Sequence, residues 1–234
     1  MVISSRFPTL SHGRIAIIIR FRPSPLIQLE LIQMPTVITD RPYRPVPVDP
    51  PRKRWTRAEC AALEASGLWE QQRLELAQGE LISKTGKKRF HVNALVAVQA
   101  WLVRTFGQQF VNPVAPIDVA PEDNPTNEPE PDLIVLTKPS REFQDANPRP
   151  GDLRLVVEVS DSTLGFDLTT KAELYARAGI IEYWVVDIAA RRLVVHRDPR
   201  EGLYRTVTAY AEEETVSALS SPRSEFRVAS AFGA

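Results

Sequence analysis

The chain has 234 residues, of which 43% are hydrophobic and 25% are charged. This composition matches an average soluble globular protein and excludes a fibrous or wholly disordered chain. Lysine plus arginine equals aspartate plus glutamate at 29 each, so the chain lacks the basic excess of many nucleic-acid-binding proteins. The single cysteine, Cys60, excludes an intramolecular disulfide and a cysteine-rich zinc site, and a cytoplasmic protein is expected.

The first 51 residues differ in composition from the rest of the chain. They hold nine of the 20 prolines, and their longest apolar run, residues 15–19, is much shorter than the roughly 18 residues that span a bilayer. We therefore expect no membrane span and no signal peptide. Residues 1–51 are predicted to be a disordered, proline-rich extension, and residues 52–230 a single domain. Residues 1–33 carry four arginines and one acid, which favours the hypothesis that the native chain begins at Met34.

A helix, a hairpin and a second helix open the predicted domain. Thr56 and Glu59 have the spacing of a capping box, so a helix should run to about Ser66. Alternation of polar and apolar residues over 73–76 and 79–82 predicts a β-hairpin. Apolar residues at three- and four-residue steps then predict an amphipathic helix with these residues on its apolar face: Phe90, Ala94, Leu95, Val98, Trp101, Leu102 and Phe106.

Proline-rich loops and two strands follow this second helix. Residues 109–120 look extended, and nine prolines between Asn112 and Pro150 divide the region into loops around one strand, residues 132–136. Residues 153–160 form a nearly continuous apolar run, typical of a strand in a sheet that is covered on both faces. This strand is expected to be central.

The order strand, helix, strand then predicts a crossover unit. A helix over residues 170–178 is followed by a strand pair at residues 182–188 and 193–197. Weaker strands are expected around residues 204–210 and 226–228. Together these elements predict an α/β fold.

Two acids and one lysine stand at the ends of these elements. Asp132 opens a strand, Glu158 lies near the end of the next strand, and Lys171 falls on the helix that follows. Two carboxylates brought together repel one another, and a shared proton or a divalent cation relieves the repulsion. Hard oxygen ligands suit Mg²⁺ or Mn²⁺. The pattern therefore predicts a metal-dependent phosphodiesterase site, with Asp132 and Glu158 as metal ligands.

Structural explanations compete with these roles. Asp132 follows a proline and also fits a turn, whereas a carboxylate in the apolar strand around Glu158 would need a partner or a metal. Lys171 lies four residues after Asp167, which fits an ion pair at a helix start with Asp167 as the N-cap. His91 is either a surface residue or a phosphate contact at the start of the second helix. The aromatic residues assigned to the core are Trp101, Tyr175, Tyr183 and Trp184.

An ordered set of motifs resembles the Uma-two family, also called the putative restriction endonuclease domain family. The set is Pro131-Asp132, then Val157-Glu158-Val159-Ser160, then Asp167 and Lys171, then Tyr175-Ala176, and last Glu182-Tyr183-Trp184-Val185-Val186-Asp187. Upstream, residues 74–80 resemble the family's Glu-Leu-x-x-Gly-Glu hairpin, and His91 matches a histidine that begins its long helix. The resemblance covers about Trp55 to Val228.

The resemblance implies a restriction-endonuclease-like fold of the PD-(D/E)XK superfamily, with a mixed central sheet flanked by helices. On this basis Asp132 and Glu158 bind Mg²⁺ or Mn²⁺, Glu75 assists as a further acid, and Lys171 orients a water or a transition-state oxygen. The superfamily places its lysine two residues after the glutamate, where this chain has Ser160, so the role moves to Lys171.

The first functional hypothesis is a Mg²⁺-dependent endonuclease that hydrolyses phosphodiester bonds in DNA, and a homodimer would suit cleavage of both strands. A second hypothesis is a catalytically silent module of the same fold that binds protein or nucleic acid, which the near-zero net charge favours. A third is a nuclease that acts on RNA or on a host-defence intermediate. The presence of two acids and a lysine at neighbouring element ends favours the enzyme.

Overall fold

The computed structural model describes residues 51–67, 72–84, 86 and 88–233. The chain divides into two units, Met1–Pro51 and Arg52–Ala234, and all the elements below belong to the second. The predicted proline-rich extension and the proposed start at Met34 lie outside the described residues. No helix in the described ranges is long and apolar enough to cross a membrane.

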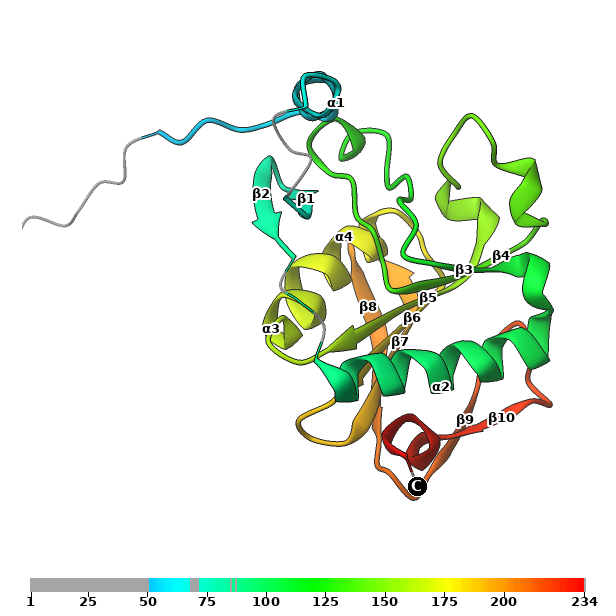
Figure 1. The fold of residues 1–234 in the computed structure, drawn as a ribbon. Helices are drawn as coiled ribbons and strands as arrows, with labels where there is room; N and C mark the ends of the chain where they lie inside the picture. The colour runs from blue at the N-terminus through cyan, green and yellow to red at the C-terminus, as the bar shows by residue number, and fades with distance from the viewer. Residues whose placement is uncertain (1–50, 68–71, 85, 87, 234) are drawn as a thin grey trace, which may run out of the picture. The chain divides into compact units, whose positions relative to one another are not determined.

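A mixed six-stranded sheet forms the centre of the second unit (Figure 1). Its strand order is β3-β4-β5-β6-β7-β8, and β5 and β6 are parallel whereas the other neighbours are antiparallel. The predicted α/β fold with a mixed sheet is therefore confirmed. The strands are β3 (Val111–Pro113), β4 (Leu133–Leu136), β5 (Leu153–Ser160), β6 (Glu182–Asp187), β7 (Arg192–Arg200) and β8 (Leu203–Tyr210).

Helices cover both faces of this sheet. On one face α2 (Arg89–Phe106) packs against the sheet through a cluster that joins Val98 to Val157. On the other face a helical segment packs through a cluster that joins Tyr175 to Val156. Neighbouring residues of β5 thus point to opposite, equally buried faces, which explains the uninterrupted apolar run of this central strand.

The helical segment between β5 and β6 is the predicted crossover, and it consists of three consecutive parts. They are α3 (Leu164–Phe166), a π-helical turn η5 (Asp167–Lys171) and α4 (Ala172–Arg177). The helix was expected over residues 170–178, so α3 and the first three residues of η5 were missed. Gly165 and the two threonines that follow it give this stretch low helix propensity.

The predicted first helix and hairpin are also present. α1 (Arg57–Ala65) begins with the complete capping box of Thr56 and Glu59. β1 (Leu74–Ala77) and β2 (Glu80–Ser83) form a separate antiparallel pair. The hairpin turns at Gln78 and Gly79 with φ values of 51° and 74°, and two successive positive φ values suit the twist of a two-residue hairpin turn.

Short elements complete the unit. Of residues 109–120, only three form a strand, because Pro113 and Pro116 limit backbone pairing. Phe90 was expected on the apolar face of α2 but is 43% exposed at the first turn. The remaining elements are the 3₁₀ turns η1 (Gln108–Phe110), η2 (Asn124–Thr126), η3 (Ser140–Glu142), η4 (Pro150–Asp152) and η6 (Val228–Phe232), and a strand pair β9 (Thr215–Ser217) and β10 (Glu225–Arg227).

Candidate active site

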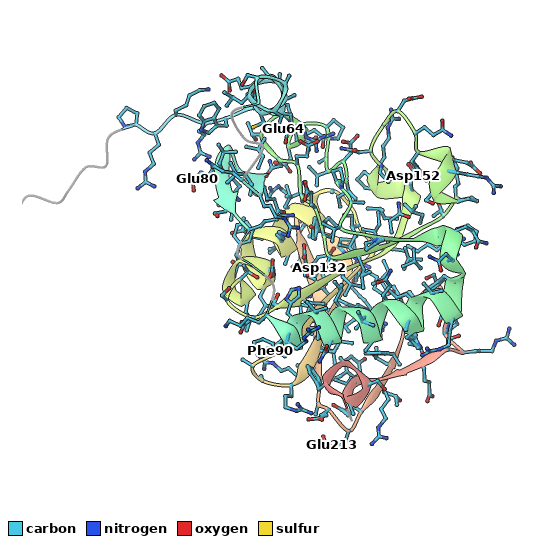
Figure 2. All side chains as sticks on the ribbon, in the orientation of Figure 1. Glu64, Glu80, Phe90, Asp132, Asp152 and Glu213 are labelled. Carbon is cyan, nitrogen blue, oxygen red and sulfur yellow. The ribbon has the colours of Figure 1, made fainter. Side chains whose placement is uncertain are left out.

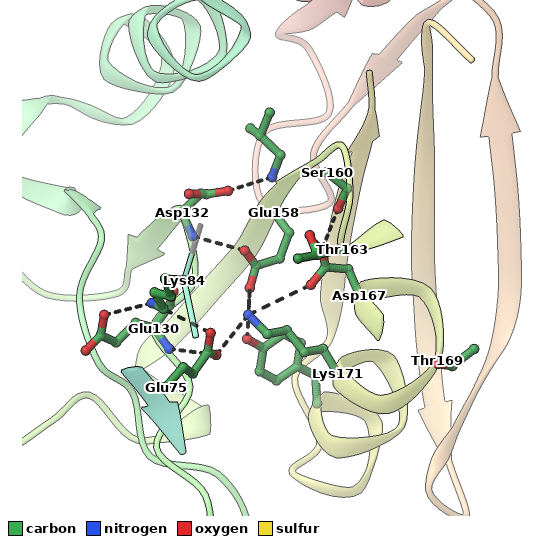
Figure 3. A network of polar contacts seen from close by, with 12 residues as sticks. Glu75, Lys84, Glu130, Asp132, Glu158, Ser160, Thr163, Asp167, Thr169 and Lys171 are labelled. Atoms are coloured by element: carbon green, nitrogen blue, oxygen red, sulfur yellow. Dashed lines mark hydrogen bonds and ion pairs between the residues drawn. The ribbon is translucent and has the colours of Figure 1, made fainter. Parts of the chain in front are cut away.

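The sheet brings the two predicted metal ligands together. Asp132 directly precedes β4, and the antiparallel register pairs Leu133 with Val157, one residue before Glu158. The backbone N–H of Asp132 donates a 3.3 Å hydrogen bond to Glu158 Oε2. In return Asp132 Oδ2 accepts a 2.8 Å hydrogen bond from the N–H of Val159. These reciprocal bonds fix both carboxylates at the same point of the sheet (Figure 3).

Lys171 reaches Glu158 from the following helical segment. Its Nζ lies 2.7 Å from Glu158 Oε1, 2.9 Å from Glu75 Oε1 and 3.8 Å from Asp167 Oδ1. Figure 3 shows the ammonium group between these carboxylates. Lys171 is 5% exposed, so its charge is balanced by the surrounding acids and not by water. The sequence-based expectation of an Asp167 ion pair holds, but Glu158 and Glu75 are the closer partners.

The structural explanation of Lys171 made Asp167 the N-cap of this helical segment, and this assignment is wrong. The segment begins at Leu164, and Asp167 lies in its π-helical turn. The Asp167 carboxylate instead accepts hydrogen bonds from Ser160 Oγ at 2.5 Å and Thr163 Oγ1 at 2.7 Å. These contacts tie the turn that carries Lys171 to the end of β5.

Glu75 enters the site from the hairpin. It is 5% exposed, and besides Lys171 it contacts Lys84 Nζ at 3.6 Å and the N–H of Glu130 at 3.3 Å. Lys84 also forms a 2.8 Å ion pair with Glu130. The sequence did not place Lys84 in the site. The other acid of the hairpin, Glu80, is exposed, whereas Glu75 is buried beside Lys171.

His91 lies at the start of α2, close to Asp132. Its Nε2 atom is 3.7 Å from Asp132 Oδ1 and, in the described part of the chain, is buried without a hydrogen-bond partner. The first turn of α2 contains no acid, and its N-cap, Lys88, makes no capping side-chain bond. Of the two interpretations of His91, the surface residue is therefore wrong, because its side chain is 13% exposed and lines the site cavity.

The cluster of charged residues around Lys171 has more acids than bases, and this excess and the burial of the groups shift their pKa values. Burial raises the pKa of Glu158 to about 8; Lys171 opposes this increase, and the neighbouring acids add to it. Burial also raises the pKa of Asp167, against Lys171 and the two hydroxyls that bind it. Burial lowers the pKa of Lys171, but Glu158, Tyr175, Glu75 and Asp167 together raise it well above its ordinary value. Lys171 therefore stays protonated at neutral pH, and Glu158 binds a proton more tightly than an ordinary glutamate does.

These groups line one cavity of about 330 Å³. Asp132 and Glu158 are 8% and 5% exposed, and both line this cavity. The lining also includes the basic residues Arg73, Lys84 and Lys88. Phe166 adds an aromatic ring to the lining, with Lys171 Nζ 5.9 Å from the ring centre. A cavity lined by both acids and bases suits an anionic ligand together with a cation.

The residues present fit a hard divalent cation held by few protein ligands. In the described residues no three acids, histidines or cysteines are arranged as a complete metal cage. Mg²⁺, however, is usually bound by one or two carboxylates, with waters and substrate phosphates as its other ligands. Asp132 and Glu158 supply two carboxylates on the cavity wall, and the excess of negative charge around Lys171 favours a cation there.

The remaining predicted residues are structural. Trp101, Tyr175, Tyr183 and Trp184 are at most 6% exposed and pack in the core, as expected. The Tyr175 hydroxyl also donates a 3.3 Å hydrogen bond to Glu158 Oε1. Cys60 is a buried free cysteine of α1.

The fold is of the α/β class, with a mixed sheet that helices cover on both faces. The model of the Uma2 family, described as "Putative restriction endonuclease", matches residues 59–229. The chain belongs to this family. A search of curated proteins returned no match. Among solved structures, the chain is similar to a protein from Anabaena variabilis described as a putative nuclease belonging to DUF820. The two share 11% sequence identity with a TM-score of 0.54, over 69% of this chain and 90% of the other.

Proposed function

We propose that this protein is a Mg²⁺- or Mn²⁺-dependent nuclease that hydrolyses phosphodiester bonds in DNA. One observation carries the proposal: the carboxylates of Asp132 and Glu158, joined by reciprocal backbone bonds, meet the ammonium group of Lys171 in a single cavity. Membership of the Uma2 family supports the same reaction class. A structural ion pair alone would not require a second buried acid beside an accessible cavity.

Asp132 and Glu158 would hold the cation. A bound divalent cation supplies Lewis acidity, which activates a water and neutralises charge on the phosphate. The reciprocal hydrogen bonds orient both carboxylates before any ligand arrives, and such preorganisation lowers the cost of assembling the site. Because the pKa of Glu158 is raised, cation binding, which requires the ionised carboxylate, should strengthen as the pH rises.

Lys171 would act as a positive charge and hydrogen-bond donor. A lysine whose pKa is raised keeps its proton, so it is unsuited to act as a general base. Its position against Glu158 allows it to stabilise negative charge that develops on the phosphate oxygens in the transition state. Glu75 would hold Lys171 in place through the 2.9 Å ion pair, which makes Glu75 a positioning residue in this mechanism.

The test is cleavage of supercoiled and linear DNA by the purified full chain, with Mg²⁺, Mn²⁺ or a chelator. The same assay is run on Asp132→Asn, Glu158→Gln and Lys171→Met. Matched controls are Glu173→Gln, an exposed glutamate of α4, and Lys138→Met, whose side chain is 59% exposed. Folding of every variant is checked by circular dichroism.

Metal-dependent nicking that is lost in the three site variants and kept in the two controls would support the proposal. We expect the loss to be at least a hundredfold, as for removal of a transition-state contact. Activity that survives in Glu158→Gln would indicate a contaminating nuclease. If the wild-type protein cleaves nothing and calorimetry detects no Mn²⁺ binding, the protein is instead a catalytically silent module that binds protein or nucleic acid.

A further inference from the structure

We propose that the cavity accepts an unpaired nucleotide, so that the preferred substrate is single-stranded or locally unpaired nucleic acid and not a continuous duplex. This inference rests on the proposed function, because it specifies which form of phosphodiester reaches Asp132 and Glu158. Three observations support it: the size of the cavity, the burial of the two acids, and the combination of basic and aromatic residues in the lining.

The cavity has the size of a small-molecule pocket. Its volume of about 330 Å³ is near the lower end of the roughly 300–1,000 Å³ of pockets that enclose small ligands. Asp132 and Glu158 are 8% and 5% exposed within it. A phosphodiester group must therefore enter the cavity to reach them. In a continuous duplex each nucleotide is held in the stack, and bringing one into a pocket requires unpairing it. A nucleotide that is already unpaired avoids this cost.

The basic residues that line the cavity can contact the phosphates of a nucleic-acid backbone. Lys88 lines the cavity with a side chain that is 65% exposed, and it pairs with Asp161 at 2.8 Å. Arg73 and Lys84 add two further cations on the hairpin side. The Lys84 side chain is only 19% exposed, whereas Arg73 and Lys88 are exposed, so Arg73 and Lys88 are the stronger candidates for phosphate contacts. Local positive charge of this kind compensates for the zero net charge of the whole chain.

Aromatic rings accompany these cations, a combination typical of sites for single strands. Phe166 lines the cavity and is only half-buried, which leaves part of its ring accessible to a base. Phe90 is 43% exposed at the start of α2 and contacts Lys88 Nζ at 5.4 Å. Figure 2 shows Phe90 at the N-terminal end of this helix. We infer that a base stacks on Phe166 while the neighbouring phosphates contact Lys88 and Arg73.

The experiment measures binding, which is independent of catalysis. Fluorescence anisotropy of a labelled 20-nucleotide strand, its blunt duplex, and a duplex with a central unpaired stretch is recorded with the full chain in a chelator. We expect the strand and the interrupted duplex to bind at least tenfold more tightly than the blunt duplex. Phe166→Leu removes the ring and should weaken strand binding roughly fivefold to a hundredfold, whereas Phe166→Trp should retain it. The matched control is Phe143→Leu, which changes a phenylalanine outside the cavity lining.

Equal affinity for the blunt duplex and the strand, no binding of any probe, or a Phe166→Leu variant that binds the strand like wild type would each overturn the inference. An RNA strand of the same sequence is an added arm, and binding of either strand in preference to the duplex supports an unpaired nucleotide. Absence of cleavage with every metal would refute the nuclease but leave this binding result intact, so the two failures can be told apart.

Discussion

Replacing Glu158 with glutamine should change how stability depends on pH. Burial raises the pKa of Glu158 to about 8 in the folded protein, from an ordinary value of 4.5. Between these two values the folded state holds a proton that the unfolded state has released. This proton stabilises the folded state fully below pH 4.5, and its contribution falls as pH rises and is lost above about pH 8. Because glutamine does not titrate, the Glu158→Gln variant should not show this loss of stability as the pH rises.

The size of the effect follows from the distance between the pH and the folded pKa. At pH 6 the wild-type protein is two pH units below a pKa of about 8, and each unit corresponds to about 1.36 kcal/mol, so a contribution on the order of 3 kcal/mol remains. At pH 9 almost none remains. The free energy of unfolding of Glu158→Gln, relative to wild type, should therefore rise by roughly 3 kcal/mol from pH 6 to pH 9.

Urea unfolding in a chelator, followed by tryptophan fluorescence, measures this difference, since Trp101 and Trp184 are buried in the core. The amide also weakens the contact with Lys171, which adds an offset that is nearly independent of pH because Lys171 stays protonated over this range. The change with pH is therefore the informative quantity. Glu173→Gln, at an exposed position, should follow wild type at both pH values. Parallel pH dependences for wild type and Glu158→Gln would refute the reasoning.

Three further substitutions test the supports of the site and fold. Lys171→Met should lower the free energy of unfolding by about 3–5 kcal/mol, because it leaves buried carboxylates without their cation. The control Lys138→Met should change it by less than about 0.5 kcal/mol. Urea unfolding compares the two variants, and equal effects would contradict the buried ion pair. Gly79→Ala should cost about 1–2 kcal/mol in thermal unfolding, because φ is +74° and the new Cβ would lie 2.9 Å from Arg54 Cβ; a wild-type melting temperature would contradict this. Thr56→Ala removes the capping hydrogen bonds of α1 and should cost about 1 kcal/mol by urea unfolding, and an unchanged midpoint would argue against the cap.

Most of the fold was predictable because its signals are local. The capping box of Thr56, the two-residue turn at Gln78 and Gly79, and the apolar run of β5 each determine a few neighbouring residues. The π-helical turn of Asp167–Lys171 gives no such signal. It is stabilised by Ser160 and Thr163, whose hydroxyls bind Asp167 only after β5 has positioned them. The start of this helical segment was therefore placed too late.

The sequence predicted the acids of the candidate site, but it did not predict all of its cations or its aromatic ring. Asp132 and Glu158 were identifiable because charged residues at the ends of apolar strands are unusual. Lys84 and His91 come from the hairpin connection and the start of α2, and only the tertiary arrangement brings them to the same cavity as Asp132. A phenylalanine such as Phe166 looks like an ordinary core residue in a sequence, so its place in the lining had no local signal.

The displaced lysine has a structural explanation. In the superfamily that the sequence resembles, the lysine follows the glutamate by two residues on the same strand, and here that position is Ser160. Ser160 is fully buried, and its hydroxyl binds Asp167, the first residue of the turn that ends in Lys171. Ser160 thus anchors the π-helical turn, and the turn places the Lys171 ammonium group 2.7 Å from Glu158 Oε1. Because Ser160 and Lys171 depend on one another through Asp167, moving the lysine back to position 160 would remove the contact that holds the turn, and we expect the two arrangements to be alternatives that cannot be combined in one site.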